Sequence, residues 1–123
     1  MTTILLVEDD PHQRLLYRLE LEDAGFEVVL ASSGSDAIGL ARQELPHLVV
    51  VNPNLSDMKF EVFIRVLQNL SQDLIVVVHS GDAQQELACR NITDGFVLKS
   101  SDLLPLRNKI GSLLKKKETQ QIV

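Results

Sequence analysis

Short apolar runs recur along the chain, separated by longer segments in which apolar residues return every three or four positions. The short runs cover residues 4–7, 26–30, 48–51, 74–78 and 96–98. Continuous apolar runs of this length are typical of strands that are buried on both faces of a parallel sheet. The pattern therefore predicts five strands that alternate with helices.

The first helix has recognisable start and stop signals. Asp10 is placed to cap it, Pro11 suits its first position, and Gly25 suits the turn that ends it. The helical period predicts an inner stripe of three leucines: Leu15, Leu16 and Leu19. Tyr17 lies off that stripe and is expected to be exposed.

Further helices are expected after the later strands. Ser33 is placed to cap the second helix, which ends before Pro46. A third helix follows the third strand, and a weaker helix covers about residues 82–90. The last helix extends to Leu114, and residues 115–123 are expected to form a frayed end.

Polar side chains follow four of the five predicted strands. They are Glu8, Asp9 and Asp10 after the first strand, Asn52 after the third, Ser80 after the fourth and Lys99 after the fifth. Successive strand–helix units predict a parallel sheet with helices on both faces, and such sheets bind ligands at the carboxyl ends of their strands. We therefore expect these side chains to meet at one edge of the sheet.

The acids and the lysine have a functional and a structural interpretation. Adjacent acids repel one another, which is usually tolerated where a cation binds, and oxygen ligands with room for water suit Mg²⁺ better than zinc. Alternatively, Asp10 only caps the helix while Glu8 and Asp9 are solvated. Lys99 needs an anionic partner at a buried strand end, and Asp9 is one candidate. Ser80 could orient a phosphoryl oxygen or cap the next helix.

Length and composition restrict the function classes. The 123 residues fit one domain, which we place at residues 1–115 with a tail at 116–123. A net charge of -5 argues against binding to nucleic acid. The single cysteine, Cys89, is expected to be a small buried hydrophobe. It cannot form an internal disulfide, and no apolar stretch approaches the roughly 20 residues of a membrane span, so we expect a cytoplasmic protein without a membrane partner.

Four segments at the predicted strand ends carry a family resemblance: residues 4–11, 46–58, 78–81 and 96–99. In combination they resemble the receiver domains of two-component response regulators, over essentially the whole chain up to about Leu114. The resemblance implies a flavodoxin-like, doubly wound α/β fold with a parallel sheet in the order 2-1-3-4-5 between two layers of helices. It also implies a role in phosphorelay signal transduction.

The resemblance assigns a metal set and places an amide at the central position. Glu8 and Asp9 would be the acid pair for Mg²⁺, with Asp9 as a direct ligand. The main-chain carbonyl of Asn54 and the side chain of Asn52 would complete the set. Asn52 stands where the family has its phosphoacceptor aspartate.

The remaining site residues are also implied by the resemblance. Ser80 would be the hydroxyl that turns inward on activation, and Phe96 would be the switch aromatic. Lys99 would hold the phosphoryl group. The family also commonly makes contacts through the fourth helix, the fifth strand and the fifth helix.

The amide at Asn52 shapes the functional hypothesis. An amide cannot act as a carboxylate nucleophile, and the site loses one negative charge, so Mg²⁺ is expected to bind weakly. We interpret the chain as an atypical pseudo-receiver that is not phosphorylated at the usual site and is not an enzyme. It would act through a protein partner, namely a histidine kinase, an output domain or another signalling protein, as a monomer or a weak dimer.

Two alternatives stay open, one within the receiver class and one among the enzymes. The chain could be an ordinary phosphorylatable regulator in which Asn52 is an introduced change, or in which Asp57 replaces it as acceptor. Asp57 is expected to open the third helix, which would keep it far from Lys99. The chain could also be a small α/β phosphatase that uses Glu8 and Asp10, although it lacks a cap domain and a glycine-rich phosphate loop.

Overall fold

Five parallel strands form one sheet in the order β2-β1-β3-β4-β5. The strands are β1 (Thr3–Val7), β2 (Glu27–Ala31), β3 (Leu48–Val51), β4 (Ile75–Ser80) and β5 (Gly95–Leu98). The structure is a computed structural model that describes residues 1–121. Its sheet and flanking helices confirm the predicted fold class, with strand bounds that differ from the predicted ones by two residues or fewer.

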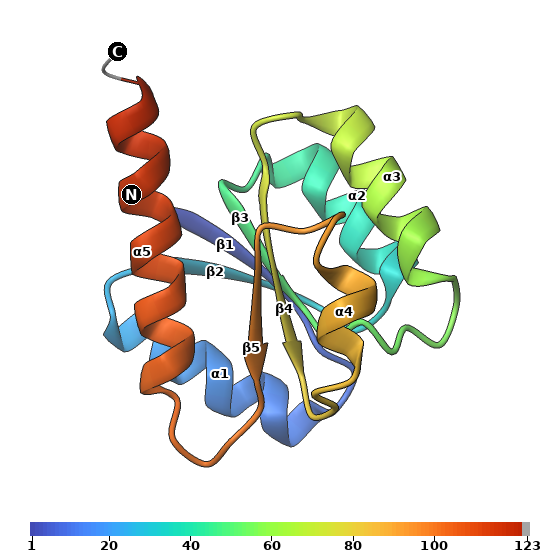
Figure 1. The fold of residues 1–123 in the computed structure, drawn as a ribbon, viewed down its shortest axis with the longest axis horizontal. Coiled ribbons are helices and arrows are strands. Elements are labelled where there is room, and N and C mark those ends of the chain that lie inside the picture. The colour runs from blue at the N-terminus through green and yellow to red at the C-terminus, as the bar shows by residue number, and fades with distance from the viewer. Residues whose placement is uncertain (122–123) are drawn as a thin grey trace.

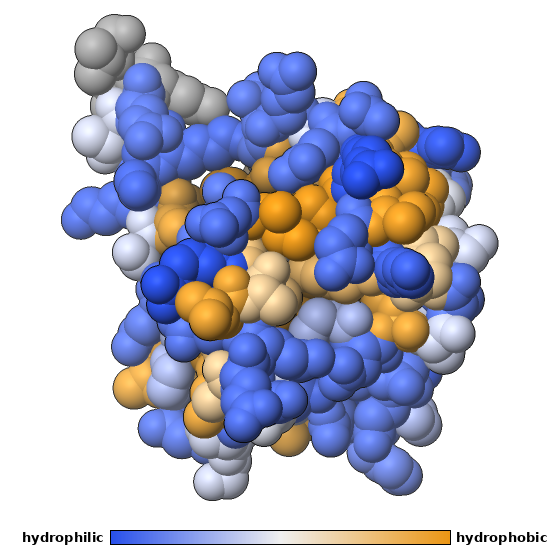
Figure 2. Space-filling view, turned by 45° about the vertical axis from the view of Figure 1, so that its right-hand side comes forward, coloured by the Kyte–Doolittle hydropathy of each residue, from blue (hydrophilic) through white to orange (hydrophobic). Residues whose placement is uncertain are grey.

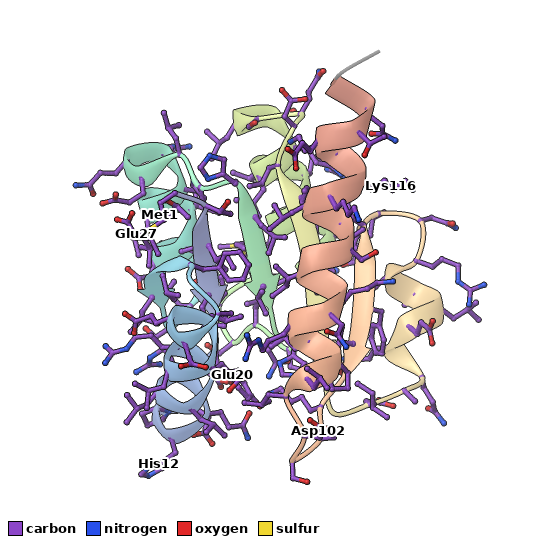
Figure 3. The ribbon with its side chains drawn as sticks, turned by 90° about the vertical axis from the view of Figure 1, so that its left-hand side faces the viewer. Met1, His12, Glu20, Glu27, Asp102 and Lys116 are labelled. Carbon is purple, nitrogen blue, oxygen red and sulfur yellow. The ribbon has the colours of Figure 1, made fainter. Side chains whose placement is uncertain are left out.

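Helices cover both faces of the sheet (Figure 1). They are α1 (Pro11–Asp23), α2 (Gly34–Glu44), α3 (Phe60–Leu70), α4 (Gln85–Cys89) and α5 (Leu104–Gln121). Helices α1 and α5 lie side by side on one face (Figure 3), where Nη1 of Arg107 is 3.3 Å from Oε1 of Glu20. Helices α2, α3 and α4 cover the other face. No helix in the described part of the chain is both long and apolar enough to cross a membrane.

Alternate residues of each strand belong to two separate cores. Along β1, Leu5 and Val7 pack in the core that α2 and α3 cover. Ile4 and Leu6 point to the opposite face and pack with α1 and α5. Because both faces are covered, both sets of side chains must be apolar, which explains why the strands are continuous apolar runs.

Helix α1 is rotated relative to the prediction. Tyr17 and Leu21 are its buried residues, whereas the three leucines predicted to face inward are each about half exposed: Leu15 at 48%, Leu16 at 52% and Leu19 at 53%. The predicted exposure of Tyr17 is therefore wrong. A tyrosine can be buried where its hydroxyl finds a partner, and here that hydroxyl donates to Oε1 of Gln13 at 3.2 Å.

The last helix is longer than predicted. Helix α5 continues through Lys115 to Gln121, so the expected fraying from Lys115 onward is wrong for residues 115–121. The Thr119 hydroxyl bonds back to the carbonyl of Lys115, and the Lys117 ammonium donates to the carbonyl of Asp73. Residues 122–123 of the predicted tail lie outside the described residues. The fourth helix is shorter than the predicted 82–90.

Candidate functional site

The carboxyl ends of β1, β3, β4 and β5 bring the predicted polar residues to one edge of the sheet. Main-chain hydrogen bonds extend the strand pairing into this edge. The N–H of Asn52 donates to the carbonyl of Val7 at 3.1 Å, and the N–H of Lys99 donates to the carbonyl of Ser80 at 2.7 Å. The parallel topology therefore gathers the residues that follow four different strands, as the sequence pattern indicated.

Lys99 forms a buried ion pair with Glu8. Its Nζ lies 2.6 Å from Oε1 of Glu8, and only 16% of the lysine side chain and 3% of the glutamate side chain are exposed. The proposed pairing with Asp9 is wrong, because Asp9 is exposed to water and its charge is solvated there. A carboxylate buried as deeply as Glu8 needs a counter-ion, and Lys99 is the cation that reaches it.

Gln13 of α1 gives Lys99 its second partner. The same Nζ donates to Oε1 of Gln13 at 2.6 Å, and that oxygen also accepts from the Tyr17 hydroxyl. Nζ lies 5.8 Å from the centre of the Tyr17 ring, within the range of a cation–π interaction. Lys99 is thus held against α1, and its two acceptors are Glu8 and Gln13.

His79 lies beneath this network on the α1 side of the sheet. Its ring and that of Tyr17 form an edge-to-face pair with the centroids 4.7 Å apart, and only 2% of His79 is exposed. Burial, with a smaller contribution from the charge of Lys99, lowers the pKa of His79 to about 4. The imidazole is therefore neutral near pH 7. Burial also raises the pKa of Tyr17, with a further contribution from the Glu8 carboxylate.

Sequence reasoning missed Gln13 and misplaced Tyr17. These residues are four apart on α1, so they share one helix face and both reach Lys99. That spacing is the signal that could have identified them. It was obscured by the three leucines, which suggested a different inner face.

Asp10 caps α1, as the structural interpretation of the three acids predicted. Its carboxylate accepts from the N–H groups of His12 and Gln13, at 2.9 and 3.1 Å. These bonds, led by the one from Gln13, lower the pKa of Asp10. The cap also fixes the first turn of α1, from which Gln13 reaches Lys99.

The side-chain oxygens at this edge are a poor set of ligands for Mg²⁺. Both carboxylate oxygens of Glu8 are engaged, one by Lys99 and the other by the N–H of Asp10 at 3.2 Å. The side-chain oxygen of Asn52 accepts from the N–H of Asn54 at 3.1 Å. Within residues 1–121, no group of three histidine, cysteine, aspartate or glutamate side chains could hold a metal ion.

A guanidinium adds positive charge beside the acids. Nη1 of Arg14 donates to the main-chain carbonyl of Glu8 at 2.8 Å and more weakly to that of Asp9 at 3.4 Å.

The exposed carboxylate of Asp9 and the neutral oxygens of Asn52 and Asn54 lie around one small pocket. A divalent cation there would meet one negative side chain, the lower end of the one or two carboxylates that usually bind Mg²⁺ together with phosphate oxygens.

Ser80 and Phe96 lie on the side of the sheet edge next to α4. Ser80 is fully buried, and its hydroxyl donates to Oε1 of Gln85 and accepts from the N–H of Asp82 at 3.0 Å. It does not cap α4, whose N-cap residue is Gln84. Phe96 is partly buried against the core that α2 and α3 cover.

Asp57 caps α2, and the expectation that it opens the third helix is wrong. Its two oxygens accept from the N–H of Gly34 at 3.0 Å and from the N–H of Ser35 at 2.8 Å. These bonds, led by the one from Ser35, lower the pKa of Asp57. Met58 packs so closely on Gly34 that a Cβ there would lie 2.9 Å from its sulfur. Both oxygens of Asp57 are thus occupied by hydrogen bonds to the start of α2.

Replacing Lys99 with methionine is expected to destabilise the fold by about 3 kcal/mol, because Glu8 would remain buried without its counter-ion. The exposed Lys115→Met is the matched control, expected to change stability by less than about 0.5 kcal/mol. Urea unfolding measures both. Equal midpoints for the two variants would show that the Lys99–Glu8 pair does not stabilise the fold.

The buried His79 predicts a loss of stability in mild acid. The unfolded chain binds a proton near the ordinary pKa of 6.5, whereas the folded state resists it until about pH 4. Stability therefore falls as the pH drops from about 6.5 to about 4, by up to roughly 3 kcal/mol. An NMR titration of the His79 ring, identified by its loss in His79→Gln, should show a midpoint near 4. A midpoint above pH 6 would contradict this placement.

Comparisons with known proteins agree on one family. The sequence matches the model of the response regulator receiver domain over residues 4–111. The transcription regulator BvgA of Bordetella pertussis is 32% identical over 104 residues, which cover 81% of this chain and 50% of BvgA. The chain therefore spans about half the length of this relative.

Solved structures share the fold. A CheY-like receiver domain protein from Methanospirillum hungatei JF-1 has a TM-score of 0.89 at 21% identity, with 98% of each chain covered. The response regulator TrrA from Thermotoga maritima, solved in complex with Mg²⁺ and BeF, has a TM-score of 0.84 at 23% identity, covering 92% of this chain and 99% of TrrA. With the family match over most of its length, the chain belongs to the response regulator receiver domain family of two-component signalling.

Proposed function

We propose that this chain is an atypical receiver domain, which works in two-component signalling without accepting a phosphoryl group. The observation that carries the proposal is Asn52, an amide directly after β3, where the family resemblance leads us to expect the phosphoacceptor aspartate. A carboxylate nucleophile forms an acyl phosphate through a negatively charged oxygen, and an amide oxygen has no such charge. The side chain of Asn52 instead accepts a hydrogen bond within its own loop.

The position of Lys99 supports the same proposal. In the family this lysine would hold the phosphoryl group. Here its ammonium is bonded to Glu8 and Gln13, at 2.6 Å from each. Moving it to a phosphoryl group at Asn52 would leave the Glu8 carboxylate buried without a counter-ion, which is strongly unfavourable.

Mg²⁺ would bind this domain weakly. TrrA was solved with Mg²⁺ and BeF, so a related fold holds the ion. In this chain Glu8 is already neutralised and Asn52 adds no charge, so Asp9 would be the principal ligand, with oxygens of Asn52 and Asn54. One carboxylate and neutral oxygens are a poor set for an ion that dehydrates reluctantly.

A protein partner would read the state of this domain. The relatives are response regulators and transcription regulators, and BvgA is about twice as long as the matched region. A histidine kinase, an output domain or another signalling protein would fit.

Apolar surface lies among polar side chains on the side that carries α3 and α4 (Figure 2), where Val62 and Leu87 are 44% and 72% exposed. The net charge of -5 disfavours nucleic acid as the direct partner.

The alternative acceptor, Asp57, is not supported by its contacts. Both of its oxygens accept hydrogen bonds at the start of α2. These bonds stabilise the carboxylate where it is, and phosphorylation would break them. If this chain is an ordinary receiver in which Asn52 is an introduced change, the Asn52→Asp variant will accept a phosphoryl group.

Incubation with a small phosphodonor and Mg²⁺ is expected to leave the intact mass unchanged, because no carboxylate occupies the acceptor position. The Asn52→Asp variant restores the nucleophile, and a phosphorylatable receiver in a parallel reaction confirms that the donor is active. Intact mass spectrometry measures the result. A stoichiometric, acid-stable and base-labile phosphoryl adduct on the native chain would overturn the proposal, and its persistence or loss in Asp57→Asn would locate it.

A further inference from the structure

Helix α4 is held by very few contacts. It comprises five residues, Gln85–Cys89, and Glu86, Leu87 and Ala88 are exposed to solvent. The side chains that face the protein are Gln85 and Cys89, which are four residues apart. A helix of this length is unstable by itself, so its position depends on tertiary contacts.

The Gln85 side chain bridges two loops at the edge of the site. Its Nε2 donates to Oδ1 of Asn54 at 2.8 Å, and its Oε1 accepts from the hydroxyl of Ser80. The NH₂ of Gln85 thus faces the Asn54 oxygen, and the Gln85 oxygen faces the Ser80 hydroxyl. In this orientation every hydrogen-bond donor of the bridge meets an acceptor. The bridge joins α4 to the end of β4 and to the loop after β3.

Ser80 also fixes the loop that leads into α4. Its oxygen accepts from the N–H of Asp82 at 3.0 Å, and Oδ1 of Asp82 accepts from the N–H of Gln84 at 2.9 Å. Ser80 is fully buried, so water does not readily replace these bonds. The hydroxyl is therefore the fixed point to which both the loop and the helix are attached.

We propose that Gln85 is a latch that keeps α4 closed over the core without any phosphoryl group at the site. Releasing its two hydrogen bonds lets α4 open and exposes Cys89, which is 4% exposed in the closed state. The latch is independent of whether Asn52 accepts phosphate, so it goes beyond the proposed function.

The labelling rate of Cys89 measures opening, because Cys89 is the only cysteine of the chain. Gln85→Ala is expected to react with iodoacetamide roughly tenfold faster than the native chain, since the loss of two hydrogen bonds increases the open population. Gln84→Ala is the matched control. Its position is adjacent and exposed and its side chain makes no capping hydrogen bond, so its rate should equal the native rate.

Two further variants examine the two ends of the bridge. Asn54→Ala removes one end and is expected to increase the labelling rate. Gln85→Glu keeps an acceptor for Ser80 but loses the donor to Asn54, so its rate should lie between those of the native chain and Gln85→Ala. Hydrogen exchange identifies the opening as local if it rises at residues 83–93 while the central strands β1 and β3 keep their protection.

Two results would overturn the latch. One is a labelling rate for Gln85→Ala equal to that of Gln84→Ala. The other is a rise in exchange of the same size in β1 and β3 as in α4, which would mean that the whole domain unfolds. No phosphodonor is present in these experiments, so either failure would leave the proposed function unaffected.

Discussion

The ion pair between Lys99 and Glu8 is the interaction on which the organisation of this site depends. It joins the ends of β1 and β5, which are separated by two other strands, across the edge of the sheet. With 3% of the glutamate side chain exposed, neither partner can be removed without leaving a buried charge. Gln13 and the Tyr17 ring then position the ammonium against α1. An internal cation thereby neutralises the buried acid.

Neutral amides hold the rest of the site together. Asn52 closes its own loop onto Asn54, Gln85 connects Asn54 to Ser80, and Gln13 shares one oxygen between Lys99 and Tyr17. Each amide satisfies polar groups at this edge without adding charge. A site organised in this way needs neither a phosphoryl group nor a metal to fix its loops. An ordered receiver fold with an amide at Asn52 is compatible with this arrangement.

The sequence predicted the features that depend on local pattern. Residues 48–51 form β3 with the predicted bounds, and Asp10 and Gly25 delimit α1, with Gly25 at a φ of 96°. The convergence of the strand ends also followed, because parallel strands place their carboxyl ends at the same edge. Such features are set by periodicity, capping and topology, which a single sequence carries.

The features that were missed depend on which side chains meet across the fold. Lys99 forms its ion pair with Glu8 and not with Asp9. These two acids are neighbours in sequence, but Glu8 is buried and Asp9 is exposed. Asp57 reached the start of α2 from a loop more than 20 residues away. The inner face of α1 carries Tyr17, whose hydroxyl has a partner in Gln13, while the three leucines of the predicted stripe are about half exposed. The pairings of Lys99 with Glu8 and of Asp57 with α2 join residues far apart in sequence, so no period or spacing along the chain predicts them.

Adding Mg²⁺ to the native chain while following Tyr17 fluorescence tests most directly whether Lys99 has replaced the metal. Tyr17 is the only tyrosine, the chain has no tryptophan, and Tyr17 lies beside Lys99, so the signal reports on this network alone. If Lys99 neutralises Glu8, millimolar Mg²⁺ will leave the signal unchanged. A saturable change in Tyr17 fluorescence at lower Mg²⁺ concentration, reversed by a chelator, would contradict the claim that Lys99 neutralises Glu8.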